Sequence, residues 1–132
     1  MAERLTAAWI FGLAPEPAPH QFCVAVGART HKPDDAAVHL REVRLSPTET
    51  QAVGLLRVTT PLRTALDLAR WGGAAGVPVE TALLADLLDR AGMPYRPEPI
   101  RGISYSRQAA AQLQDAARLL STRCARSGAL PA

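Results

Sequence analysis

The sequence predicts a single domain of the α/β (α+β) class, built from a small mixed, partly antiparallel sheet with flanking helices. Three observations predict this fold. Short apolar runs bounded by glycine, proline and polar turns are typical of strands. Longer stretches repeat leucine and alanine at helical spacing. The chain has 132 residues, of which 48% are hydrophobic, enough for one core and within the usual size of one domain.

The first part of the chain predicts one helix and two strands. Apolar residues at helical spacing indicate a helix over residues 3–13, which a proline-rich loop follows. The apolar run 22–26 predicts a buried strand, and the mixed run 38–45 predicts a half-exposed one. Because a polar turn at 29–35 separates them, we expect these strands to pair as a long hairpin.

Two helix starts follow. Ser46 and Glu49 have the spacing of a capping box, with Pro47 at the first helical position. Residues 55–59 then predict a third strand. Thr60 precedes Pro61 in the same way, and predicts a helix that reaches about residue 71.

The remaining elements are two helices and a connector. We expect helices at about 78–91 and 106–124, joined by a proline-rich extended segment at 93–103. The last helix has a narrow stripe of small and apolar residues, which favours packing on the chain's own core over docking to a partner. We therefore divide the chain into a core, 1–92, and a region, 93–132, of connector and basic helix packed on the same domain.

The helix after Thr60 carries the candidate site. Its apolar stripe leaves Arg63, Asp67 and Arg70 together on the opposite face, at the i,i+4 and i,i+3 spacings of ion pairs. One interpretation is an anion or phosphate site at the helix start that uses Arg63. The other is a structural clamp in which Arg63 pairs with Asp67 and ties the helix to a neighbouring strand. We favour the clamp, because no glycine-rich loop precedes this helix.

Basic residues gather towards the C-terminus. Residues 93–132 hold six arginines against Glu98 and Asp115, whereas the rest of the chain is nearly neutral. Such a basic end is either a solvated helix face or a surface for a polyanion. The candidate nucleic-acid contacts are Arg101, Arg107, Arg118 and Arg123.

No catalytic or metal-binding pattern occurs in the sequence. The histidines have no metal-ligand spacing, and no nucleophile, phosphate-loop or dinucleotide motif is present, so we expect no enzyme, metal or cofactor. Cys23 lies in an apolar run and far from Cys124, which suits a core residue in a reducing cytoplasm. No apolar stretch approaches the roughly 18 residues of a membrane span. We expect a soluble cytoplasmic protein.

Several motifs follow one another in a recognisable order: TAAWIFGL at 6–13, the apolar strand, VHLR at 38–41, and VGLLRVTTPLRTALDLA at 53–69. This order resembles the C-terminal domain of AbiEi-type antitoxins, from bacterial type IV toxin–antitoxin systems of abortive infection. The resemblance covers about residues 5–92. The T-P-x-R-T-A-x-D-L-A pattern is its most specific part, with Thr60, Arg63 and Asp67 as characteristic positions.

The resemblance implies a non-enzymatic antitoxin that neutralises a nucleotidyltransferase-like toxin without needing a stable complex. In the family a winged-helix domain binds operator DNA, and we expect this chain to lack that domain. Any DNA contact would then be salt-dependent phosphate binding. The alternative is a nucleic-acid-binding accessory module, or a fragment of a transcriptional regulator, acting through the C-terminal arginines.

Overall fold

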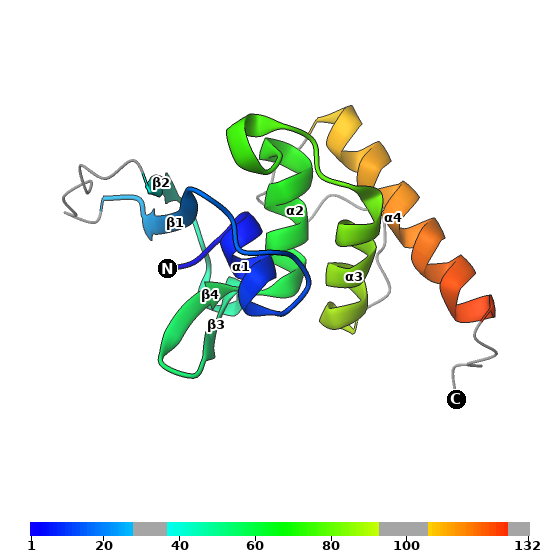
Figure 1. Ribbon diagram of the computed structural model, residues 1–132, viewed down its shortest axis with the longest axis horizontal. Helices are drawn as coiled ribbons and strands as arrows, with labels where there is room; N and C mark the ends of the chain where they lie inside the picture. The colour runs from blue at the N-terminus through cyan, green and yellow to red at the C-terminus, as the bar shows by residue number, and fades with distance from the viewer. Residues whose placement is uncertain (28–36, 93–105, 127–132) are drawn as a thin grey trace.

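Helix α2 lies at the centre of the fold, with two helices on one side and the first helix and the strands on the other (Figure 1). The computed structural model describes residues 1–27, 37–92 and 106–126. The helices are α1 (Arg4–Ile10), α2 (Pro61–Trp71), α3 (Thr81–Ala91) and α4 (Arg107–Arg126). The strands are β1 (His20–Ala25), β2 (Val38–Val43), β3 (Thr50–Val53) and β4 (Leu56–Thr59). Helices α3 and α4 pack together and against α2. The presence of both helices and strands confirms the predicted mixed fold class.

The prediction that the first two strands form a hairpin was wrong. Strand β1 pairs with β2 in parallel, with Cys23 opposite Arg41. Residues 26–37 separate the strands, and about a dozen residues suffice for a parallel connection, so the length of this segment does not determine the strand direction. In the parallel direction Arg41 reaches carboxylates of the N-terminal segment and of α2. These ion pairs depend on the tertiary structure and leave no periodic signal in the sequence.

The N-terminal residues join the two strand pairs into one sheet, which the sequence did not predict. Ala2 bridges β1 in the antiparallel sense and β4 in the parallel sense. Its amide donates to the Arg57 carbonyl at 2.9 Å, and its carbonyl accepts from the Thr59 amide at 3.0 Å. On the other side, the Cys23 amide donates to the Met1 carbonyl at 2.8 Å. The strand order is therefore β2, β1, residues 1–3, β4 and β3.

A hairpin of β3 and β4 replaces the short helix expected after Ser46. The Glu49 carboxylate does accept from the Ser46 amide at 2.8 Å, but only the 3-10 turn η1 (Pro47–Glu49) forms. Strand β3 follows at once and pairs antiparallel with β4 around Gly54, whose φ of 60° suits glycine. The sequence prediction missed β3 because its residues are only partly buried and carry no apolar alternation.

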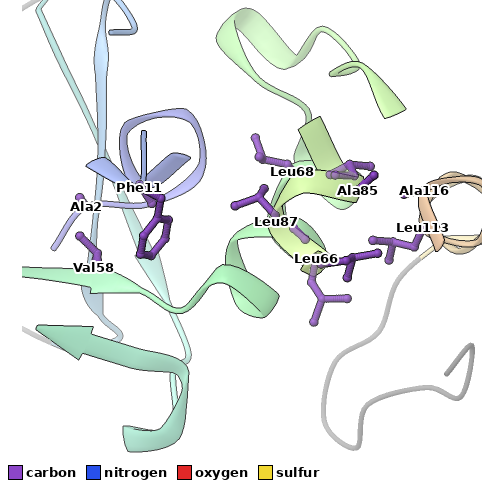
Figure 2. Packing of buried hydrophobic residues seen from close by; sticks show 13 residues of the cluster. Ala2, Phe11, Val58, Leu66, Leu68, Ala85, Leu87, Leu113 and Ala116 are labelled. Atoms are coloured by element: carbon purple, nitrogen blue, oxygen red, sulfur yellow. The ribbon is translucent and has the colours of Figure 1, made fainter. Parts of the chain in front are cut away.

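The hydrophobic core lies between α2, α3 and α4 and extends towards the sheet (Figure 2). Its largest fully buried apolar side chains are Leu66, Leu68, Leu84, Leu87, Leu88, Leu113 and Val58. Burying one such side chain contributes about 1.5–3 kcal/mol. The last helix takes part in this core through Leu113 and Ala116, both fully buried.

Candidate functional site

The candidate site begins where β4 passes into α2. Thr60 caps the helix, since its hydroxyl oxygen accepts from the Arg63 amide at 3.3 Å, and Pro61 opens the first turn. Behind the cap, the hydroxyls of Thr59 and Thr64 lie 2.7 Å apart and are buried. This packing holds the first turn of α2 against the end of β4, and so determines where Arg63 points.

Arg63 connects two carboxylates. Its Nε donates to Asp67 Oδ2 at 3.0 Å, and its Nη1 donates to Glu49 Oε2 at 2.6 Å. The pair between Arg63 and Asp67 has the spacing seen in the sequence, and the contact with Glu49 ties α2 to the turn before β3. The Arg63 side chain is only 7% exposed and that of Asp67 only 1%. The face of α2 that we expected opposite the buried stripe is therefore also buried.

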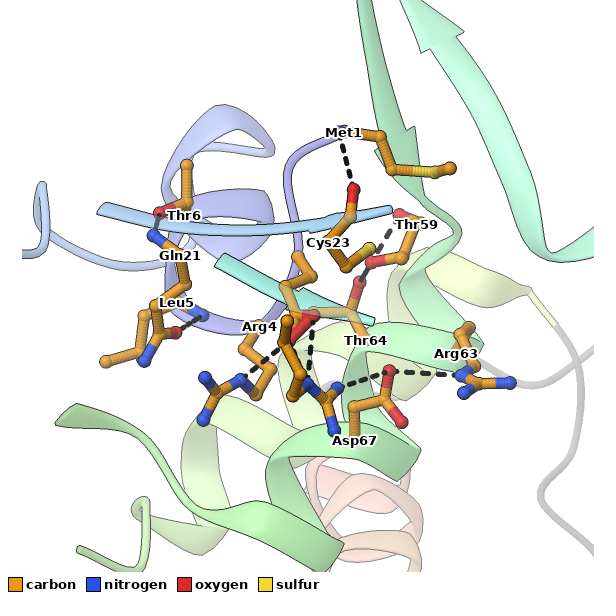
Figure 3. A network of polar contacts seen from close by, with 12 residues as sticks. Met1, Arg4, Leu5, Thr6, Gln21, Cys23, Thr59, Arg63, Thr64 and Asp67 are labelled. Atoms are coloured by element: carbon orange, nitrogen blue, oxygen red, sulfur yellow. Dashed lines mark hydrogen bonds and ion pairs between the residues drawn. The ribbon is translucent and has the colours of Figure 1, made fainter. Parts of the chain in front are cut away.

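Asp67 continues the network towards β2 and the N-terminus (Figure 3). Arg41 Nη2 lies 3.6 Å from Asp67 Oδ2, and Arg41 Nε donates to Glu3 Oε1 at 2.8 Å. Arg4 Nε donates to the same Glu3 oxygen at 2.9 Å. Six charged groups of alternating sign thus run from Glu49 to Arg4, and they link η1, α2, β2 and the N-terminal segment.

The network constrains the backbone conformation of Arg4. Its φ of 44° is left-handed, a conformation that non-glycine residues seldom adopt. The guanidinium donates to Glu3 and, at 3.4 Å, to the Gly72 carbonyl beyond the end of α2. Strained residues persist where the surroundings determine their position, and here the two contacts supply that constraint.

Burial and ion pairing shift the pKa values of the network residues in opposite directions. Burial raises the pKa of Asp67, and the nearby arginines offset this only in part. For Glu49 the balance is reversed: burial opposes ionisation, but the Ser46 amide and Arg63 together lower its pKa. Burial would lower the pKa of Arg63, but Glu49 and Asp67 outweigh it and raise the pKa. Removing one member would therefore leave an uncompensated charge inside the protein.

Arg70 has a different environment from Arg63. The expected pair between Asp67 and Arg70 is not among the ion pairs of the described residues; the Arg70 guanidinium carbon lies 5.1 Å from the centre of the Trp71 ring. Burial lowers the pKa of Arg70, and the charges of Arg63 and Arg41 lower it further, whereas the charge of Asp67 offsets these effects in part. Arg70 thus lies near the charge of Asp67 but forms no ion pair with a carboxylate of the described residues.

Sequence reasoning found the cap Thr60 and two members of the network, Arg63 and Asp67, but missed the other four. Glu3, Arg4 and Arg41 lie far from α2 in the chain, and no spacing rule connects them to it. Glu49 was noticed only as part of a capping box. Its second oxygen, which pairs with Arg63, leaves no signal in the sequence.

Two of the C-terminal arginines form ion pairs with carboxylates. Arg118 pairs with Asp115 at 3.3 Å, and Arg123 pairs with Asp86 at 2.6 Å, both at exposed positions. Arg107 begins α4 and is exposed, and Arg101 lies outside the described residues. Two of the four candidate nucleic-acid contacts therefore already have a carboxylate partner.

The described residues contain neither a cluster typical of a metal site nor a cysteine with a reactive thiol environment at position 23. Residues 1–27, 37–92 and 106–126 hold no group of three or more histidine, cysteine or acidic side chains that could bind a metal. Cys23 is fully buried, and burial together with the nearby Glu3 raises the pKa of its thiol to about 12. A thiol with such a pKa is a poor nucleophile near neutral pH. Within the same ranges, none of the helices is both long and apolar enough to cross a bilayer.

Comparison with known proteins identifies a family. The family model described as the AbiEi antitoxin C-terminal domain matches residues 1–122. Neither the curated proteins nor the solved structures yield a match. The family match includes the N-terminal segment, the whole ion-pair network and most of α4.

Proposed function

Because the chain belongs to the AbiEi antitoxin C-terminal domain family, we propose that it is an antitoxin that neutralises a nucleotidyltransferase-type toxin encoded beside it. The observation that carries this proposal is the extent of the match, residues 1–122 of 132. The proposal places the protein in the bacterial cytoplasm, with the toxin as a functional partner and no catalytic step of its own.

The geometry of the motif supports a scaffold role for Arg63 and Asp67 in this function. Both side chains point into the protein and are paired there, so they offer little surface to a toxin. We infer that they act as the clamp, holding α2 to β2 and to the turn before β3. Neutralisation then depends on the surface that this scaffold positions, and Arg63 contributes through folding.

The test is growth rescue. The chain is co-expressed with the adjacent open reading frame, and we expect it to restore growth that the neighbour's product suppresses. Arg63→Ala should reduce rescue in proportion to the loss of folded protein, which circular dichroism and the soluble level measure. Arg118→Ala is the matched control, because its ion pair is exposed and should matter little.

Two outcomes would contradict the proposal. A toxic neighbour that the folded wild-type chain fails to neutralise would remove the antitoxin role. A folded Arg63→Ala protein that has lost rescue would remove the scaffold role, because the side chain would then act directly. In the first case, salt-dependent binding of nucleic acid through the C-terminal arginines becomes the hypothesis to test.

A further inference from the structure

A basic groove lies beside the ion-pair network and is not explained by it. Its volume is about 290 Å³, just below the roughly 300–1,000 Å³ that is usual for small-molecule sites. It opens between the end of β2 and the last turn of α2. Its polar and aromatic lining residues are Arg41, Arg44, Arg63, Arg70, Glu42 and Trp71.

The four arginines of the groove fall into two pairs. Arg41 and Arg63 are bound to buried carboxylates, and these contacts hold them in place as the inner wall. Arg44 and Arg70 have no carboxylate partner within the described residues. Glu42 is the only carboxylate among the described residues that line the groove. The positive charge that the groove offers to a ligand therefore resides on Arg44 and Arg70, because Arg41 and Arg63 are neutralised by their carboxylate partners.

An anion in the groove would pair with Arg44 and Arg70. Burial and the charges of Arg63 and Arg41 lower the pKa of Arg70, and the charge of Asp67 offsets them only in part. Guanidinium groups bind phosphate with two parallel hydrogen bonds, which makes a phosphate group a suitable anion for such a site.

Trp71 adds an aromatic surface to the same groove. The side chain is half-exposed, and the guanidinium carbons of Arg41 and Arg70 lie 5.4 Å and 5.1 Å from its ring centre. Exposed aromatic rings beside arginines are typical of sites that stack a nucleobase while cations hold the phosphate.

We propose that this groove binds a nucleotide, with its phosphate on Arg44 and Arg70 and its base against Trp71. Arg41 and Arg63, held by their carboxylate partners, form the inner wall. The size of the groove suits one nucleotide, either free or at the end of a single strand. This proposal does not depend on the antitoxin role, since binding is measured on the isolated protein.

The test follows the indole N–H signal of Trp71 by NMR while 5′-AMP is added to the full chain. The Trp9 indole, on α1, is the internal control. We expect a saturable shift at Trp71, and binding of adenosine and of ribose 5-phosphate at least about tenfold weaker, because each lacks one recognised part. An adenosine decamer with a 5′-phosphate distinguishes the source: tighter binding than AMP identifies a strand end, and equal binding a free nucleotide.

Variants locate the site. Arg70→Gln and Arg44→Gln should each weaken AMP binding about tenfold or more, because each removes a charged contact to phosphate. Neither arginine takes part in the buried network, so folding should be retained. Arg90→Gln, at an exposed position of α3, removes the same charge elsewhere and should leave the affinity unchanged.

Three results would overturn the proposal. One is the absence of a saturable shift at Trp71 with AMP. Another is equal binding of ribose 5-phosphate, which would remove the role of the base. The third is an equal loss of affinity in Arg90→Gln and Arg70→Gln, which would indicate general electrostatic attraction in place of a built site.

Discussion

Arg63 and Cys23 show how burial changes the contribution of a single side chain to stability and its protonation. On a solvated helix face, the Arg63–Asp67 pair would contribute a few tenths of a kcal/mol. At 7% and 1% side-chain exposure, the same pair belongs to a network whose members cannot be removed singly without leaving a buried charge. Cys23 is equally buried and sits near the carboxylate of Glu3, which favours its neutral thiol.

The stability of Arg63→Ala tests the network. The substitution leaves Asp67 and Glu49 without their main partner, so we expect the free energy of unfolding to fall by about 3 kcal/mol. Urea denaturation followed by circular dichroism measures it. Arg118→Ala should stay within about 0.5 kcal/mol of the wild type. Equal effects of the two substitutions would show that the buried pairs contribute no more than a surface pair.

Alkaline pH tests the environment of Cys23. The thiol pKa rises from 9.0 to about 12 on folding, so the unfolded chain loses this proton first as the pH rises. Stability from this group is complete below pH 9 and falls above it, by at most about 1.4 kcal/mol per pH unit. Urea titrations under reducing conditions should therefore show a steeper decline for the wild type than for Cys23→Ala. Parallel declines would contradict the shifted pKa.

Helix α2 is the element on which both halves of the fold depend. One side carries Leu66 and Leu68 into the core with α3 and α4, and the other carries Arg63 and Asp67 to the ion pairs. The residue that follows the C-terminal end of α2 is also restricted in type. Gly72 has a φ of 73°, and a Cβ there would lie 2.6 Å from the Gly76 carbonyl oxygen, so only glycine fits.

Helix α4 is predicted to be essential to the core although it comes last in the chain. Leu113→Ala should lower the free energy of unfolding by about 2–5 kcal/mol, because it leaves a cavity against α3. Ser121→Ala, at an exposed position of α4, should change it by less than about 0.5 kcal/mol. A chain that stops at Gly92 should lose cooperative unfolding. A stable, cooperative truncated chain would show that α4 is dispensable.

At the scale of the whole molecule, two interactions connect the parts. Residues 1–3 join the two strand pairs, and α2 is shared by the polar network and the leucine core. Because no described element stands apart from these connections, we expect the chain to unfold as one unit.

The double variant Arg63→Ala/Leu113→Ala tests this unity. Arg63 belongs to the polar network and Leu113 to the hydrophobic core, and the two side chains share no ion pair or hydrogen bond, so their effects on unfolding should add within about 0.5 kcal/mol. Tryptophan fluorescence and far-ultraviolet circular dichroism should report one coincident transition. Two separate transitions in either single variant would show that the sheet and the helices unfold independently.

The sequence by itself determined the local elements that have strong start and stop signals. Thr60, Pro61 and Gly72 define α2 almost to the residue. Leucines at helical spacing identified α3, and a stripe of small and apolar residues identified α4. The i,i+4 spacing also predicted the pair between Arg63 and Asp67. These features depend on neighbours within one or two turns of the chain, which is the range over which sequence patterns carry information.

The tertiary structure alone decided the features that join distant segments. These are the parallel direction of β1 and β2, the strand role of residues 1–3, and the burial of the polar face of α2. Each depends on pairing with a segment far away in the chain, and several different pairings satisfy the same local pattern. The basic groove belongs to this class too, because it exists only where β2 meets the end of α2.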